Sequence, residues 1–203
     1  PQHRLLLETT WRAMENNDLG IDSLNDSKTG VFVGISTQDY IQLTGDPEAL
    51  EPARATGNAH SMAANRISYW LNLKGPSIAI DTACSSSLSA LHMAIKSIRS
   101  GECEMAIVAG VNLLLDASVS GTLAKAGMLS KDTQCKTFDA SANGYVRGEG
   151  CGVVILSSKE HALSNNFTEL AQVLGSATNH DGKTSSLTAP NGPAQQAVIN
   201  TAL

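Results

Sequence analysis

The stretch that decides the fold is GPSIAIDTACSSSLSALHMAIKSIRS, residues 75–100. Its first part, GPSIAIDT (75–82), has the pattern of a short buried strand, and from about Ser85 apolar residues recur at helical spacing. Gly101 follows as the expected C-cap glycine. The predicted helix has an apolar face and a polar face, formed respectively by Leu88, Leu91, Ile95 and Ile98 and by His92, Lys96 and Arg99.

Cys84 lies at the junction between the predicted strand and the predicted helix. A sharp strand-to-helix turn pushes a side chain out of the end of a sheet, and unpaired N–H groups at a helix start favour an anion there. A thiol in such a place can have a lowered pKa, and a thiolate is a good acyl acceptor. Free cysteines are also among the most buried residue types, so the position alone leaves both a nucleophile and a packing residue open.

Strand patterns alternate with helical patterns along the rest of the chain, which favours an α/β fold with largely buried sheets. The helical patterns cover residues 4–14, 61–73 and 159–165. The strand patterns cover residues 29–36, 103–112, 148–158 and 167–178, and Val153 to Leu156 indicate a buried strand.

Composition excludes several classes of protein. The 203 residues carry a net charge of −5 without a cluster of Lys and Arg, so a nucleic-acid partner is not expected. No apolar run approaches the roughly 20 residues that span a bilayer. The cysteines at 84, 103, 135 and 151 show neither a CxxC pair nor metal-ligand spacing with the five histidines, which favours free thiols in a cytoplasmic protein without a metal site.

Several blocks together resemble the β-ketoacyl synthase (ketosynthase) domains of type I polyketide synthases. The block around the cysteine is GPSIAIDTACSSSLSALHMA (75–94). The others, in order, are PQHRLLLETTWRAME (1–15), TGNAHSMAANRISY (56–69), GMLSKDTQCKTFDASANGYVRGEGCGVVIL (127–156) and TNHDGKTSSLTAPNGPAQ (178–195). The TACSSS form points to polyketide synthases more than to dissociated fatty acid synthases.

The resemblance implies a thiolase-like layered α/β/α/β/α fold, in which two similar halves each stack a mixed sheet between helices. Residues 1–157 would form most of the N-terminal half without its first strand, and residues 158–203 would begin the C-terminal half. We therefore expect an incomplete fold and a piece of a longer protein. Family members are homodimers, and GPSIAI (75–80) is the strand expected at their interface.

The resemblance also implies a reaction. Cys84 would accept an acyl chain from the phosphopantetheine arm of an acyl carrier protein, and its own backbone N–H would be one donor of the oxyanion hole. A malonyl-type extender on a carrier protein would then lose CO₂ and attack the thioester, in polyketide or fatty acid biosynthesis. No tightly bound cofactor is implied. The family's two catalytic histidines belong to HGTGT and NxGH blocks, and neither block occurs in these 203 residues.

The histidines of this chain fit other roles better. His180, beside Asp181, matches a loop of the family and neither catalytic block, and His92 lies more than two helical turns from Cys84. His60 is expected to order the wall of the site, and His3 and His161 are expected at the surface. By the same resemblance, TAPNGPAQ (188–195) would line the approach for the pantetheine arm.

Polar residues of the block at 127–156 are expected to support the site and not to carry chemistry. Asp139, Arg147 and Glu149 match the family's motif and are predicted to form a bracing internal ion pair. The glycines at 148, 150 and 152 do not fit GxGxxG and precede a strand, and DGKT (181–184) lacks the first glycine of a Walker A loop, so nucleotide binding is not expected. Cys103, Cys135 and Cys151 are interpreted as structural.

Two alternative functions remain open. A ketosynthase-like domain that binds and passes acyl chains without elongating them would keep Cys84. A thiolase-type acyltransferase acting on coenzyme A thioesters would share the fold and the cysteine but not the TACSSS block. A serine hydrolase is not supported, because no GxSxG motif occurs.

Overall fold

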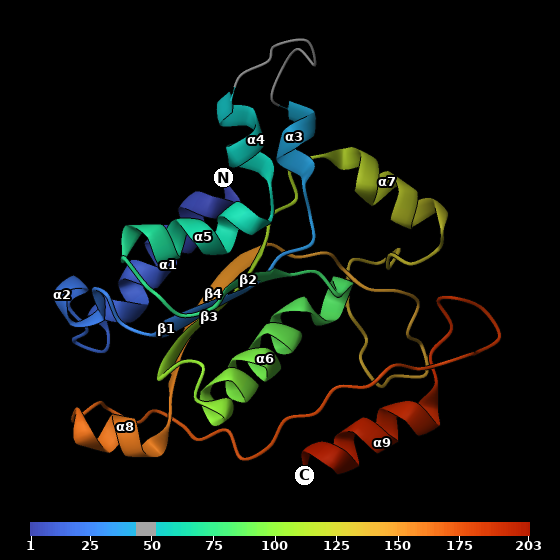
Figure 1. The fold of residues 1–203 in the computed structure, drawn as a ribbon. Helices are drawn as coiled ribbons and strands as arrows, with labels where there is room; N and C mark the ends of the chain where they lie inside the picture. Colours follow the sequence, from blue (N-terminus) through green and yellow to red (C-terminus); the bar gives the residue numbers. More distant parts are fainter. Residues whose placement is uncertain (44–51) are drawn as a thin grey trace.

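The computed structural model describes residues 1–43 and 52–203, and its centre is a mixed four-stranded sheet (Figure 1). Two strands run parallel to β1 on either side of it, and the fourth is antiparallel to β3. The order across the sheet is β2 (Ser77–Ile80), β1 (Thr29–Gly34), β3 (Met105–Asn112) and β4 (Gly150–Ser157). β1 and the start of β3 are buried, as their Val-, Ile- and Ala-rich sequences predict.

Helices cover both faces of the sheet. α1 (Gln2–Glu15) and α5 (Ser61–Trp70) pack on one face, and α6 (Ser86–Ser100) crosses over β1 on the other (Figure 1). Two apolar clusters result: a larger one beneath α1 and α5, and a smaller one between α6 and the sheet. The described residues thus form a helix–sheet–helix arrangement, as expected for one half of a layered α/β fold.

The other helices of the described ranges lie around this centre. They are α2 (Ile21–Leu24), α3 (Asp39–Leu43), α4 (Pro52–Asn58), α7 (Ala117–Lys125), α8 (Lys159–Ser164) and α9 (Gly192–Ala202). Of the helices in the described ranges, none has the length and apolar character needed to cross a membrane.

α6 packs through most of the predicted face, since Ile95 is buried and Leu91 and Ile98 pack against the same apolar cluster. The most buried residues of the helix, however, are the small Ala90 and Ala94. Leu88, expected in the core, is 70% exposed. Small side chains let the helix axis approach the sheet closely, so the bulky residues fall at the border of the contact. The helix ends at Gly101 with φ of +77°, as its glycine predicts.

Two strand predictions are wrong in part. β4 is an edge strand: Cys151, Val153 and Ile155 face the core beneath α1, whereas Val154 is 52% exposed, so the strand is not buried on both faces. Residues 167–178 form no strand at all, because no described segment hydrogen-bonds to them as a ladder partner. Leu170 and Leu174 in this segment are more than 80% exposed.

Candidate functional site

A hollow of about 950 Å³ opens at the carboxyl ends of β1 and β3, where α6 begins. Ligands of open α/β sheets bind at this edge, because the loops that follow the strands converge there. The residues after β1, the start of α6, α7 and the beginning of β4 all contribute to its walls. Much of the lining is apolar, including Leu88, Leu91, Val119 and Leu123.

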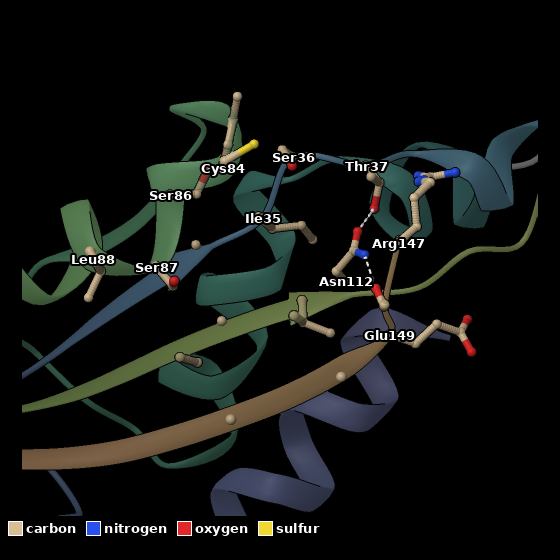
Figure 2. A pocket seen from close by; sticks show the side chains of 18 of the residues that line it. Ile35, Ser36, Thr37, Cys84, Ser86, Ser87, Leu88, Asn112, Arg147 and Glu149 are labelled. Carbon is tan, nitrogen blue, oxygen red and sulfur yellow. Dashed lines mark hydrogen bonds between the residues drawn. The ribbon is translucent and has the colours of Figure 1, made fainter. Parts of the chain in front are cut away.

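Cys84 lies on the rim of this hollow, in the turn between β2 and α6. The turn is a short 3₁₀ helix, η1 (Ala83–Ser85), and Cys84 is exposed, with its sulfur projecting off the turn (Figure 2). Ala83 has φ of +54°, a left-handed conformation that costs a non-glycine residue roughly 1–2 kcal/mol. The chain thus makes the sharp strand-to-helix turn expected from the sequence, and strain is concentrated at the residue before the thiol.

Two glycines let α6 begin close to the sheet. A Cβ on Gly34, at the end of β1, would lie 2.5 Å from the backbone nitrogen of Ser87. A Cβ on Gly110 in β3 would lie 2.8 Å from the Cβ of Ser87. No side chain fits at either position without moving the first turn of α6, so the glycines fix where Cys84 stands.

Hydroxyl groups around the turn bind one another and the backbone. The Ser85 hydroxyl donates to the carbonyl oxygen of Thr82 at 2.8 Å, and the Thr82 and Ser89 hydroxyls lie 3.0 Å apart. The Asp81 carboxylate accepts the Ala83 N–H at 3.0 Å. The serine-rich sequence thus supplies the hydrogen bonds that a strained turn requires, besides keeping the approach to Cys84 uncrowded.

The opposite wall joins the extensions of β1, β3 and β4. The Thr37 hydroxyl donates to the Asn112 amide oxygen at 3.2 Å, and the Asn112 amide donates to the Gly148 carbonyl oxygen at 2.7 Å (Figure 2). The Glu149 carboxylate accepts the Leu114 N–H at 2.7 Å. These bonds tie the three chain segments together where the hollow opens.

A second carboxylate, that of Asp39, holds the segment that follows β3. Asp39 is only 7% exposed and accepts the backbone N–H groups of Leu115 and Asp116. No motif in the sequence pointed to this residue, whose only signal is an acidic side chain close behind an apolar strand.

The predicted ion pair among Asp139, Arg147 and Glu149 is not formed. Arg147 donates to the Ser120 hydroxyl at 2.7 Å, and Asp139 accepts both the N–H and the hydroxyl of Ser141. The latter bonds lower the pKa of Asp139. Each of the three residues therefore binds a different segment, and the ion pairs found among residues 1–43 and 52–203 lie elsewhere.

An ion pair that the sequence reasoning did not foresee holds the loop before β4. Lys136 pairs with Asp132, which also accepts the Ser130 hydroxyl and the Asn143 amide. The hydrogen bond from Lys136, followed by that from Ser130, lowers the pKa of Asp132 far below its ordinary value. The loop ends at Tyr145, which lines the hollow.

No histidine of the described residues lines the hollow. The ring nitrogen Nε2 of His60 lies 3.3 Å from the carbonyl oxygen of Thr37, a lining residue, which fits a wall-ordering role. His92 binds the Ser176 hydroxyl at 2.9 Å, and His180 accepts the Gly182 N–H at 2.8 Å in a separate hollow of about 600 Å³.

The two histidines expected at the surface are partly buried. His161 packs against the ring of Phe167 at 5.8 Å between centroids. Burial, with the charge of Arg66 and other nearby cations adding to it, lowers the pKa of His3 to about 4. Both residues therefore lie at the surface only in part.

The other cysteines have contacts that suit structural roles. Cys103 is buried, and its thiol lies 3.4 Å from the Ser97 hydroxyl. Cys135 accepts the Val146 N–H at 3.1 Å, and burial raises the pKa of Cys151. In the part of the chain that the structure describes, no three His, Cys, Asp or Glu side chains gather as a metal site would require.

An exposed thiol at the start of a helix, beside a largely apolar hollow, defines a site suited to covalent acyl transfer. Comparison with known proteins agrees with this class. The model of the β-ketoacyl synthase N-terminal domain matches residues 1–162, and the model of the β-ketoacyl synthase C-terminal domain matches residues 170–203. The chain belongs to the β-ketoacyl synthase family.

Its relatives are polyketide synthases. The chain is 48% identical, over its whole length, to a phenolphthiocerol/phthiocerol polyketide synthase polypeptide of Mycobacterium tuberculosis and covers 9% of that protein. It is 47% identical to the polyketide synthase GfsA of Streptomyces halstedii and covers 3% of it. The chain therefore spans a small part of these proteins.

Solved ketosynthase structures share the fold. The ketosynthase from module 6 of the bacillaene synthase of Bacillus subtilis is 40% identical, with a TM-score of 0.90 over 98% of this chain and 34% of its own. The oxazolomycin ketosynthase domain of Streptomyces albus is 41% identical, with a TM-score of 0.92 over 100% of this chain and 36% of its own. The thiolase-like fold class predicted from the sequence is confirmed.

Proposed function

We propose that the protein containing this chain is a polyketide-type ketosynthase and that Cys84 is its acyl-accepting nucleophile. The observation that carries the proposal is the placement of Cys84: exposed at the start of α6 and beside a hollow of about 950 Å³. The exposure opposes the alternative of a packing cysteine, and the apolar lining suits an acyl chain.

The first half-reaction is a thioester exchange. The Cys84 thiolate attacks the carbonyl carbon of an acyl group carried on the phosphopantetheine of an acyl carrier protein. The new S–C bond forms as the pantetheine thiolate leaves and takes up a proton. While the intermediate is tetrahedral, its oxygen carries negative charge, and the backbone N–H of Cys84, which has no acceptor among the described residues, would stabilise it.

The second half-reaction is the condensation. A malonyl-type group on a carrier protein loses CO₂, and the electron pair of the broken C–C bond forms the enolate. The enolate carbon attacks the acyl-Cys84 carbonyl, which creates the new C–C bond and releases the Cys84 thiolate. The family's HGTGT and NxGH histidine blocks do not occur in these 203 residues, so we assign stabilisation of the enolate to the complete ketosynthase.

The remaining expectations extend the proposal. The two family halves would meet near residue 157, the protein would act in the cytoplasm without a tightly bound cofactor, and the ketosynthase would be a homodimer. β2 supports the last point, because it is an edge strand whose outer side has no partner among the described residues. Introducing proline at Ala79 should reduce the dimer fraction measured by light scattering.

The test is acyl transfer followed by condensation in the complete protein that contains this chain. With an acyl-loaded carrier protein, the wild type should gain one acyl group on Cys84, and Cys84→Ala should gain none. Cys135→Ser is the matched control, because it removes another exposed cysteine and retains an acceptor for the Val146 N–H. Acylation of Cys84→Ala would refute the proposal, and acylation without condensation would indicate the non-elongating alternative.

A further inference from the structure

Among residues 82–87, which form the strained turn and the start of α6, only Ser86 is buried. It is 6% exposed, whereas its neighbours Cys84 and Ser85 are exposed. Its hydroxyl donates to the carbonyl oxygen of Ala83 at 2.6 Å and accepts the N–H of Thr82 at 3.0 Å. One side chain thus binds the backbone on both sides of Ala83.

These bonds act on a conformation that the backbone does not favour. Ala83 has φ of +54°, and its N–H is already held by the Asp81 carboxylate. A left-handed alanine persists only where its surroundings compensate the strain. The Ser86 hydroxyl supplies such compensation from within the protein, where solvent does not compete for its hydrogen bonds.

The orientation of one peptide group follows from this arrangement. The Ala83 carbonyl oxygen accepts both the hydroxyl and the backbone N–H of Ser86. In a trans peptide the C=O and N–H groups point in opposite directions, and the described residues contain no cis peptide. The N–H of Cys84 shares this peptide with the Ala83 carbonyl, so it points away from Ser86.

The Cys84 N–H has no acceptor within the described parts of the protein. It is therefore free to bind a ligand, at the edge of the hollow where the thiol lies. Two donors on the Ala83 carbonyl also polarise the peptide, which strengthens the N–H on its other side. Through these bonds the Ser86 hydroxyl is placed to influence both the direction and the strength of the Cys84 N–H donor.

We propose that Ser86 is a positioning residue for acyl transfer, which holds the Ala83–Cys84 peptide so that the Cys84 N–H faces the acyl oxygen. The inference rests on the proposed function, because it assigns a task to the N–H beside the nucleophile. Ser86 would act through the backbone, so its loss should weaken stabilisation of the oxyanion without changing the reactivity of the thiol.

The separation provides the test, made in the complete protein that contains this chain. Thioester exchange develops negative charge on an acyl oxygen, which an N–H donor can stabilise. Alkylation by iodoacetamide is a displacement at a saturated carbon and develops no such charge. Ser86→Ala should lower the rate constant for acylation of Cys84 by about tenfold to a hundredfold, as expected for the loss of two hydrogen bonds. The KM for the acyl carrier protein and the rate of alkylation should stay within about twofold of the wild type.

Ser100→Ala is the matched control, because its hydroxyl donates to a backbone carbonyl three residues earlier at the other end of α6. It should change neither rate. If Ser86→Ala folds poorly, the comparison is made in an Ala83→Gly background, since glycine adopts positive φ without strain. Ala83→Gly/Ser86→Ala should still acylate more slowly than Ala83→Gly while alkylating equally fast.

Equal losses of acylation and alkylation would overturn the inference, because they would show a structural role alone. Normal acylation of Ser86→Ala would overturn it as well. Both results differ from failure of the proposed function, in which the wild-type protein itself would take no acyl group on Cys84.

Discussion

Replacing Gly34 by alanine tests whether the contact between β1 and α6 places the nucleophile. The new Cβ would lie 2.5 Å from the backbone nitrogen of Ser87 and 2.7 Å from the carbonyl carbon of Ser86. Ordinary contacts begin at 3.4 Å, so the start of α6 must retreat by about 1 Å. Overpacking of this kind costs about 1–3 kcal/mol of unfolding free energy, and a 1 Å displacement of a reacting group can cost about 10²-fold in rate.

The assay compares acylation of Cys84 with the thermal stability of the complete protein that contains this chain. Gly34→Ala should acylate roughly 100-fold more slowly, by intact-protein mass spectrometry, and melt at a lower temperature. Gly57→Ala is the control, because a Cβ there meets no atom within 4 Å. If Gly34→Ala acylated at the wild-type rate with an unchanged melting temperature, the contact could not be what positions the helix.

Three further predictions concern groups away from the thiol. Because burial raises the pKa of Cys151, its alkylation rate should keep rising above pH 9.0. At pH 7 the partly buried Cys151 should be alkylated more slowly than the exposed Cys84, and rapid labelling of Cys151 at pH 7 would contradict this. The pKa of His3 is lowered from 6.5 to about 4, so protonation of His3 opposes folding. The free energy of unfolding should therefore fall as the pH falls from 6.5 towards 4, and it should fall less in His3→Gln. Identical pH profiles of the two proteins by denaturant titration would refute this. In Gly144→Ala the residue would have φ of +129° and a Cβ only 2.5 Å from the Leu129 carbonyl carbon. The substitution should lower the free energy of unfolding, measured by chemical denaturation, by about 1–3 kcal/mol. An unchanged free energy would show that the loop adapts.

The sequence was sufficient to predict the elements that bear on the site. Apolar runs indicated β1, β2, β3 and β4, and the transition at Cys84 indicated the turn, because period-2 and period-3.6 patterns meet there. Apolar spacing predicted Ile95, Leu91 and Ile98 on the packed side of α6, but not how closely the helix begins to the sheet. That approach depends on Gly34 and Gly110, which come from distant parts of the chain and leave room for Ser87 in the first turn of α6.

Hydrogen-bond partners were the weakest part of the sequence reasoning. Asp139, Arg147 and Glu149 lie close in sequence and have complementary charges, yet each binds a different segment. Charge complementarity does not show which backbone N–H groups lie nearby. In this fold the Leu114 N–H binds Glu149 and the Ser141 N–H binds Asp139. The segment at 167–178 shows the same limitation for strands, because an extended pattern becomes a strand only beside a partner.

The proposed reaction requires that the thiol of Cys84 receives the acyl group. The most direct measurement is peptide-mapping mass spectrometry of the complete protein after brief exposure to an acyl-loaded carrier protein. An acyl mass increase should be confined to the peptide that contains Cys84 and should be lost on treatment with hydroxylamine, which cleaves thioesters. An acyl group found only on another residue, with Cys84 unmodified, would contradict it.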